Sequence, residues 1–121
     1  MGRMSGLPEV LAVSGSALAQ RSLLLRIAEA CPAFSGHFPG VPLLPGVAQV
    51  DWALKLARLH LPAVAAQGGG FQSLAGLKFR RVIVPGTTLM LELSWSAPAL
   101  SFHYRSEAGD QVFSQGRITL K

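Results

Sequence analysis

The stretch of sequence that decides the fold is PGVAQVDWALKLARL, residues 45–59. Its apolar positions recur at helical spacing, which predicts a helix from Val47 to about Leu59 that Pro45 helps to start and Pro62 ends. In a helical projection, Val47, Val50, Leu54, Ala57 and Leu61 fall on one side, and Trp52, Leu56 and Leu59 fall near the other. A helix that is apolar nearly all round is a buried helix, so we expect the remaining elements to pack around it.

Strand-like segments lie on both sides of this helix in the sequence. After a break at residues 67–70, four of them follow one another at about 71–82, 88–96, 100–106 and 111–120, separated by turns that contain Pro or Gly. Before the helix, residues 22–27 predict a strand, and residues 1–20 predict a loosely ordered lead-in with one short strand at about 9–13. One buried helix followed by consecutive antiparallel strands predicts an α+β fold in which a sheet wraps around the helix.

Length and composition limit the number of domains and favour self-association. The chain has 121 residues, of which 50% are hydrophobic and 14% are charged. This balance is typical of one compact domain, which we expect over residues 1–121, and it excludes a two-domain enzyme. So few charged side chains leave too little polar surface to cover the outside, which predicts a homo-oligomer.

The cysteine count and the apolar runs bear on compartment and metal content. Cys31 is the single cysteine, which predicts no intramolecular disulfide, no zinc site and a reducing, cytoplasmic compartment. No apolar run approaches the roughly 18 residues of a membrane span. Pro8 and Glu9 interrupt the apolar stretch near the N-terminus, which argues against a signal peptide.

A proline-rich segment before the helix carries the first candidate catalytic residue. Four prolines and two glycines from Pro32 to Pro45 exclude regular secondary structure and predict a rigid, shaped loop. Within it, the run FSGHFPG holds His37 among aromatic neighbours. An imidazole exchanges protons near neutral pH, so His37 is a candidate general base. The alternative is a structural histidine that bonds a loop carbonyl.

The second candidate is Asp51, one turn beyond Val47 on the predicted helix and within its apolar arc. Burial there would favour the protonated, acid-competent carboxyl at neutral pH. Lys55 stands four residues further on, at the spacing of a helical ion pair. If that pair forms at the surface, Asp51 is a solvated residue with no catalytic role.

The start of the helix, at Gly46 and Val47, lies between the two candidates in the sequence. Backbone N–H groups at a helix N-terminus have no intrahelical acceptor, and the helix dipole favours negative charge there. Gly46 would leave room for close approach of a substrate carbonyl. A base, an acid and an oxyanion site together suit proton abstraction next to a thioester carbonyl with loss of a β-hydroxyl.

These residues resemble the signature of a known family. The run FSGHFPGVPLLPGV, residues 34–47, followed by Asp51, resembles that of the FabZ/FabA-type 3-hydroxyacyl-acyl carrier protein dehydratases. The run LKFRRVIVPG, residues 77–86, resembles the strand and turn of the same family. The resemblance extends over about residues 21–120, and it implies the hotdog fold, an antiparallel sheet wrapped around one central buried helix.

The resemblance also implies a reaction and a role for each matched residue. His37 matches the histidine that removes the α-proton, Asp51 the acid that assists departure of the hydroxyl as water, and Gly46 the amide that donates to the thioester carbonyl. The implied product is a trans-2-enoyl thioester on acyl carrier protein, formed without cofactor or metal in fatty-acid or polyketide-type synthesis. In this family the two side chains meet across a dimer interface, so His37 of one subunit would work with Asp51 of the other.

The helix sequence narrows the resemblance further. Asp51 stands where FabZ enzymes usually carry glutamate and FabA enzymes aspartate. The run PGVAQVDWA, residues 45–53, is similar to the small ApeI-type dehydratases of aryl-polyene clusters, which act on carrier-bound polyketide-like chains. Two alternatives stay open: an acyl thioesterase of the same fold, and a non-catalytic acyl-binding or heterodimer-forming subunit. Acyl chain length and double-bond isomerisation are left open.

Positive charge is concentrated in the second half of the chain. The net charge is +5, and three arginines balance three acids through Asp51, so the excess lies in residues 52–121. Lys78, Arg80 and Arg81 form the densest cluster, which suits docking of an acidic acyl carrier protein. The alternative is ordinary solvated positions that keep the protein soluble. Three clustered basic residues without a binding motif argue against a nucleic-acid partner.

Overall fold

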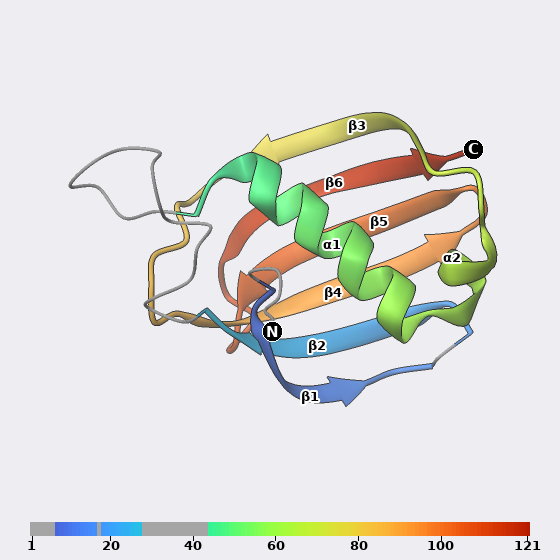
Figure 1. Cartoon of the computed structure of the whole chain (residues 1–121). Helices are drawn as coiled ribbons and strands as arrows, with labels where there is room; N and C mark the ends of the chain where they lie inside the picture. Colours follow the sequence, from blue (N-terminus) through green and yellow to red (C-terminus); the bar gives the residue numbers. More distant parts are fainter. Residues whose placement is uncertain (1–6, 17, 28–43) are drawn as a thin grey trace.

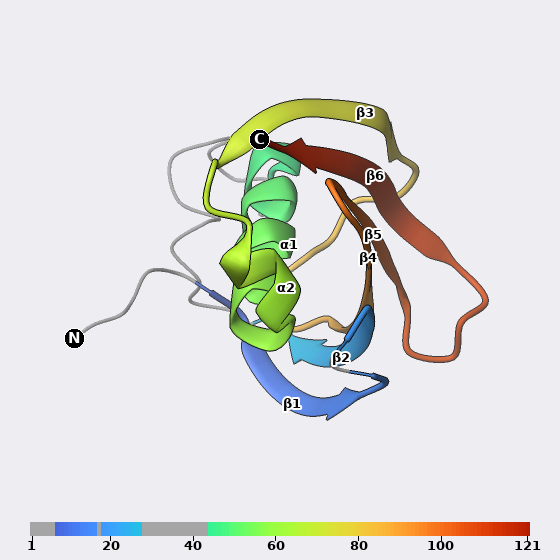
Figure 2. The same ribbon diagram turned by 90° about the vertical axis from the view of Figure 1, so that its right-hand side faces the viewer.

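The computed structural model describes residues 7–16, 18–27 and 44–121. Over these ranges the chain forms six strands and two helices: β1 (Glu9–Ser14), β2 (Gln20–Arg26), α1 (Gly46–His60), α2 (Pro62–Ala66), β3 (Phe71–Phe79), β4 (Thr88–Ser96), β5 (Ala99–Ser106) and β6 (Val112–Leu120). The strands form one sheet in the order β1-β2-β4-β5-β6-β3, and every neighbouring pair is antiparallel. Helix α1 lies across one face of the sheet (Figure 1), and the sheet curves around it (Figure 2). The predicted α+β architecture is confirmed.

The central strands alternate between the two faces of the sheet. In β4, Leu89, Leu91, Leu93 and Trp95 are buried, whereas Ser94, which lies between the last two, is exposed. Leu91 pairs with Tyr104 of β5, which is also buried. Because side chains in a strand alternate with a period of two, this pattern places the apolar residues of adjacent strands on the single face that α1 covers.

Only one side of α1 is buried. The side that faces the sheet is made by Gln49, Trp52, Ala53, Leu56 and Ala57. On other parts of the helix surface, Val47 is 74% exposed and Leu59 is 67% exposed. The prediction of a helix buried nearly all round is therefore wrong for the single chain, because the sheet covers one face of the helix and leaves the rest open.

Most predicted elements are confirmed with small differences at their ends. The predicted helix 47–59 is α1, and the short strand expected at about 9–13 is β1, which pairs with β2. Strand β3 ends at Phe79, three residues before the predicted end at residue 82. The N–H groups of Arg80 and Arg81 both donate to the carbonyl of Phe113, at 2.8 and 3.2 Å, so the regular ladder stops there.

The sequence did not predict the short helix α2, which follows α1. Pro62 comes after the end of α1 and stands in the first turn of α2, where its missing N–H removes no helical bond. Most of the predicted proline-rich loop falls on residues 28–43, which lie outside the described residues. In the part of the chain that the structure describes, neither helix has the length and hydropathy needed to cross a membrane.

Candidate active site

Asp51 lies on an open part of the α1 surface and pairs with Lys55. Lys55 Nζ is 2.9 Å from Asp51 Oδ2, and the Asp51 side chain is 53% exposed. The ion pair that the sequence left as an alternative is therefore formed, and the expected burial of Asp51 is not found in the single chain. The helical projection placed Asp51 correctly among apolar neighbours, but Val47 is largely exposed and Val50 and Leu54 are only partly buried.

Asp51 lies at the edge of an apolar groove between α1 and β3. The groove has a volume of about 500 Å³ and is lined by Gly46, Val47, Val50, Asp51 and Leu54 of α1 and by Phe71, Leu74, Leu77 and Phe79 of β3. Phe71, Leu77 and Phe79 are large apolar side chains that the single chain leaves exposed. The groove thus brings together Asp51, Gly46 and Val47, which the sequence singled out, on one hydrophobic surface.

The N-terminus of α1 begins at Gly46, next to Phe79 of β3. A methyl group placed on Gly46 would come within 2.5 Å of Phe79 Cζ, so the aromatic ring packs directly on the glycine Cα. The sequence predicted that Gly46 leaves room for a substrate. The structure shows that Phe79 occupies the space beside its Cα, a long-range contact that spacing along the chain did not indicate. The Gly46 N–H still belongs to the first turn, where no intrahelical acceptor exists.

A buried polar cluster, which the sequence did not indicate, joins the start of α1 to the sheet. Gln49 is 3% exposed. Its Nε2 donates to the Leu44 carbonyl at 3.2 Å, and its Oε1 accepts from Ser114 Oγ at 2.6 Å. The Tyr104 hydroxyl donates to the Gln49 main-chain carbonyl at 2.6 Å. Burial, with a smaller contribution from the negative charge of Asp51, raises the pKa of Tyr104 well above its usual 10.0, so this hydroxyl stays protonated.

The basic cluster is divided by the structure. Arg80 and Arg81 line a hollow of about 290 Å³ together with Gly46 and Phe79, so two arginines lie beside the helix N-terminus. Lys78 is also exposed, but it is not among the residues that line this hollow. The cluster seen in the sequence therefore brings Arg80 and Arg81, and not all three side chains, to the start of α1.

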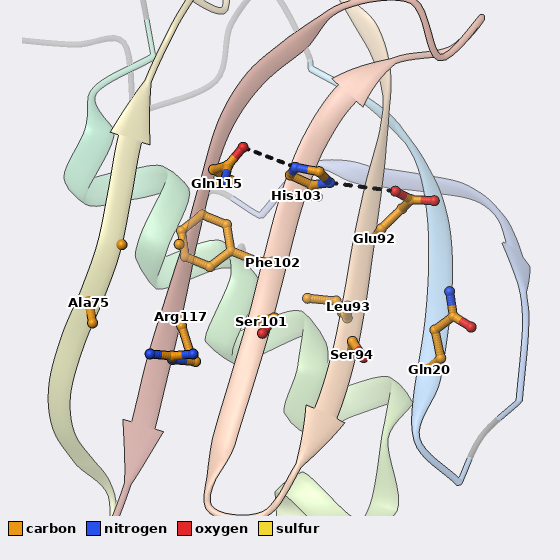
Figure 3. A pocket seen from close by; sticks show the side chains of 12 residues that line it. Gln20, Ala75, Glu92, Leu93, Ser94, Ser101, Phe102, His103, Gln115 and Arg117 are labelled. Carbon is orange, nitrogen blue, oxygen red and sulfur yellow. Dashed lines mark hydrogen bonds and ion pairs between the residues drawn. The ribbon is translucent and has the colours of Figure 1, made fainter.

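A second polar region lies on the face of the sheet away from α1 (Figure 3). His103 Nε2 lies 3.1 Å from Gln115 Oε1, and His103 Nδ1 lies 3.9 Å from Glu92 Oε1. Arg105 contacts both carboxylate oxygens of Glu92, each at 3.2 Å. This row crosses β4, β5 and β6, and its side chains are paired with one another, which identifies it as a cross-strand network that stabilises the sheet.

His37 is the predicted site residue that remains. His37 lies outside the described residues, so the structure does not place it relative to Asp51 or Gly46. Burial, with the positive charge of Arg21, lowers the pKa of His60 below its usual 6.5, which favours the neutral imidazole. Across the described ranges, no three His, Cys, Asp or Glu side chains gather where they could hold a metal ion.

The fold defines the class of protein. A solved structure of zebra fish thioesterase superfamily member 2 superposes with a TM-score of 0.61 over 89% of this chain and 78% of that chain, at 13% sequence identity. At this identity the likeness concerns the fold alone. An antiparallel sheet wrapped around one helix, with the candidate site at the start of that helix, is the hotdog fold.

The family follows from closer relatives. The model of the ApeI-like family, described as ApeI dehydratase, matches residues 16–117, and the chain belongs to this family. The structure titled the dehydratase heterocomplex ApeI:P from Xenorhabdus doucetiae aligns with a TM-score of 0.80 and 36% identity, over 93% of this chain and 96% of that chain. An uncharacterised protein from Erwinia carotovora subsp. atroseptica aligns with a TM-score of 0.79 and 40% identity, over 95% and 96%.

Curated relatives carry the FabZ name. A 3-hydroxyacyl-[acyl-carrier-protein] dehydratase FabZ from Acetivibrio thermocellus is 42% identical over 69 residues, which is 54% of this chain and 47% of that protein. The FabZ of Chloroflexus aggregans is 42% identical over 65 residues, 51% of this chain and 45% of that protein. The chain thus spans about half the length of these curated relatives. Both groups of relatives confirm the resemblance to the FabZ-like and ApeI-like dehydratases.

Proposed function

We propose that this protein dehydrates a 3-hydroxyacyl thioester carried on acyl carrier protein to the trans-2-enoyl thioester. The observation that carries the proposal is the shared groove: Asp51 and Gly46, two positions matched to the dehydratase signature, both line one apolar hollow on α1. A carboxyl group and a helix N-terminus that face the same apolar space suit an acyl thioester, which has a polar reacting end and an apolar tail.

The proposed reaction uses one base, one acid and one hydrogen-bond donor. His37 takes the proton from the carbon next to the thioester carbonyl, and the Gly46 N–H stabilises the negative charge that develops on the carbonyl oxygen. Once the partner subunit covers the groove and displaces Lys55 from its 2.9 Å ion pair, Asp51 acts as the acid and gives its proton to the β-hydroxyl. The carbon–oxygen bond then breaks, water leaves, and the electron pair forms the double bond between the α and β carbons. His37 gains one proton and Asp51 loses one, so the enzyme keeps its total number of protons. Transfer of a proton from His37 back to Asp51, by way of solvent, returns the enzyme to its starting state.

A second hotdog subunit is part of this proposal. Val47 and Phe79, on the two walls of the groove, are exposed in the single chain. Among the described strands β3 pairs only with β6, so its other edge is open. A partner subunit that covers this edge would bury the groove and remove water from Asp51, which the single chain leaves exposed. His37 of one subunit would then work with Asp51 of the other.

The basic side chains beside the helix N-terminus support a carrier-protein partner. Arg80 and Arg81 are exposed and line the hollow that Gly46 and Phe79 share. An acidic carrier protein that docks on them would bring its thioester to the start of α1. Lys78 would add positive charge to the same region without contacting the hollow.

Turnover with defined substrates tests the function. The purified protein is incubated with 3-hydroxyacyl carrier-protein thioesters of graded chain length, and trans-2 and cis-3 products are separated. We expect trans-2-enoyl product from the wild type and none from His37→Ala or Asp51→Ala, with Glu107→Ala, an exposed hairpin carboxylate, as the active control. Folded His37→Ala and Asp51→Ala proteins that both retain turnover would overturn the mechanism.

A second candidate is a non-catalytic subunit that works only with a paralogue. It is favoured by the open groove of the single chain and by the relative whose structure is titled as a heterocomplex. Activity that appears only after a paralogous ApeI-type subunit is added would support this candidate over a homodimeric enzyme. A thioesterase would instead release free carrier-protein thiol from the same substrates.

A further inference from the structure

Gln49 is a polar residue on the buried side of α1, and both polar atoms of its side chain have a hydrogen-bond partner. The Leu44 carbonyl can only accept, so it selects the NH2 end of the amide, and the Ser114 hydroxyl donates to the oxygen end. In the part of the chain that the structure describes, every buried side-chain nitrogen and oxygen has such a partner. A satisfied amide in an apolar core specifies one geometry, because any displacement leaves a polar group unpaired.

The sheet holds Gln49 at two points from adjacent strands. Ser114 of β6 is paired in register with Tyr104 of β5. The Ser114 hydroxyl holds the side chain of Gln49, and the Tyr104 hydroxyl holds its main-chain carbonyl. Two neighbouring strands of the sheet therefore fix both the position and the rotation of one helical residue.

Gln49 is also hydrogen-bonded to the peptide that carries the Gly46 N–H. The main-chain N–H groups of Ala48 and Gln49 donate to the Pro45 carbonyl, at 3.1 and 3.2 Å. That carbonyl and the Gly46 N–H belong to the same planar trans peptide and point in opposite directions. Because the Pro45 carbonyl points into the helix, the Gly46 N–H points out of its N-terminal end.

Leu44 is held on both sides, which anchors the chain just before this peptide. Its N–H donates to the Ile83 carbonyl at 2.7 Å, and its carbonyl accepts from Gln49 Nε2 at 3.2 Å. Pro45 follows, with φ held at −62° by its ring. Few torsions remain free between the anchored Leu44 and the start of the helix.

We infer that Gln49, with Ser114 and Tyr104, is a positioning residue that aims the Gly46 N–H at the thioester carbonyl oxygen. The inference rests on the proposed dehydration and deepens it, because both polar atoms of the Gln49 side chain are bonded within the protein and the residue acts through Leu44, Pro45 and Gly46. An oxyanion donor acts more strongly on the transition state than on the bound substrate. A change in the direction of the Gly46 N–H should therefore lower kcat and leave KM nearly unchanged.

The experiment compares variants that remove single hydrogen bonds. Gln49→Met keeps the shape and loses both side-chain bonds, Ser114→Ala loses one of them, and Ser114→Thr keeps the hydroxyl. Ser106→Ala is the matched control, because it removes serine hydrogen bonds to Asp110 and to the Gln111 N–H in the β5–β6 turn and none to Gln49 or Leu44. The full protein is assayed with its carrier-bound 3-hydroxyacyl substrate, and the Gly46 amide resonance is followed by NMR.

We expect Gln49→Met to lower kcat by about 10- to 100-fold, with KM within about twofold, because loss of one oxyanion donor costs about 100-fold or more. Ser114→Ala should lower kcat less than Gln49→Met does, and Ser114→Thr, which keeps the hydroxyl, should have nearly the kcat of the wild type. The double variant Gln49→Met with Ser114→Ala should be no slower than Gln49→Met alone. The Gly46 resonance should move in Gln49→Met and stay unchanged in Ser106→Ala. If Gln49→Met does not fold, Ser114→Ala and Tyr104→Phe carry the same comparison.

Two results would overturn the inference: unchanged kcat in the folded variants, or a Gly46 resonance that moves no more than in Ser106→Ala. These results differ from failure of the proposed function. If the wild type dehydrates none of the substrates, alone or with a paralogue, the dehydratase proposal fails. The Gly46 resonance still decides in that case whether Gln49 sets the direction of this amide.

Discussion

The aromatic ring of Phe79 packs on the Cα of Gly46, so that a Cβ at residue 46 would lie 2.5 Å from Phe79 Cζ. This contact joins the end of β3 to the first residue of α1. The ring also lines both hollows that meet at Gly46, the apolar groove and the one beside Arg80. The position of Phe79 therefore separates the region proposed for the acyl chain from the region proposed for the carrier protein.

Gly46→Ala should disturb the site more than the stability. The new methyl group meets the far end of a half-exposed side chain, so Phe79 can turn away at a loss of about 1 kcal/mol in the free energy of unfolding. The displaced ring would enter one of the two hollows and lower turnover by more than tenfold. Urea unfolding and steady-state kinetics measure the two effects. Gly68→Ala, with nothing within 4 Å of the added Cβ, is the control; equal turnover in the two variants would contradict this expectation.

A charge placed in the groove should prevent subunit association. Val47 is exposed in the single chain, so Val47→Glu leaves the monomer fold intact and puts a charge where the proposed partner subunit packs. We expect a monomer by light scattering and loss of turnover. Leu18→Glu introduces the same charge at a residue that is 82% exposed and does not line the groove. A Val47→Glu protein that remains a dimer would place the interface elsewhere.

Mixed subunits should complement one another. Random exchange between His37→Ala and Asp51→Ala subunits makes half of the dimers hybrids, and each hybrid has one intact site of two, which predicts about one quarter of wild-type turnover. The measurement is activity after refolding the two variants together, with subunit exchange followed by mass spectrometry. Fully exchanged mixtures without activity would mean that each site lies within one subunit.

Reversal of the arginine charges should weaken recognition of the carrier and leave chemistry intact. Arg80→Glu with Arg81→Glu places negative charge beside the helix N-terminus, so KM for a carrier-bound substrate should rise several-fold at low salt. KM for the corresponding pantetheine thioester, which lacks the acidic protein, should change little. Arg26→Glu, an exposed arginine on β2, is the control. Equal effects on both substrates would argue against docking at these residues.

The raised pKa of Tyr104 predicts that the free energy of unfolding decreases at high pH. It is the single tyrosine in the chain, and its raised pKa keeps the hydroxyl protonated in the folded state above pH 10.0, where the unfolded tyrosine ionises. The folded state then binds more protons than the unfolded state, so the stabilisation is complete below pH 10.0 and falls above it by about 1.4 kcal/mol per pH unit. Unfolding of the wild type and Tyr104→Phe at pH 9 to 12 measures the difference. A constant difference across this range would contradict the prediction.

Much of the fold could be predicted because its signals are local. Strand β4 was predicted at residues 88–96 and forms at Thr88–Ser96, and α1 differs from its prediction by one residue at each end. Alternation and prolines at the element boundaries carry this information within a few residues. The end of β3 could not be predicted, because it depends on how Arg80 and Arg81 bond the Phe113 carbonyl of another strand.

The candidate site could be predicted only in part. Residue types and spacing identified His37, Asp51 and Gly46, but a helical projection does not tell which side of α1 the sheet covers. Asp51 therefore lies on an open side, paired with Lys55. Gln49 gave no signal, because its partners Tyr104 and Ser114 are 55 and 65 residues away along the chain.

The sequence by itself determined most of the secondary elements, the family resemblance and the chemical groups proposed for dehydration, since these depend on residue type and short spacing. Only the tertiary structure decided which face of α1 stays open, that Phe79 packs on Gly46, and that Gln49 ties the helix start to β5 and β6. Each of these depends on contacts between distant segments, which form when the sheet curves around the helix and which no local pattern records.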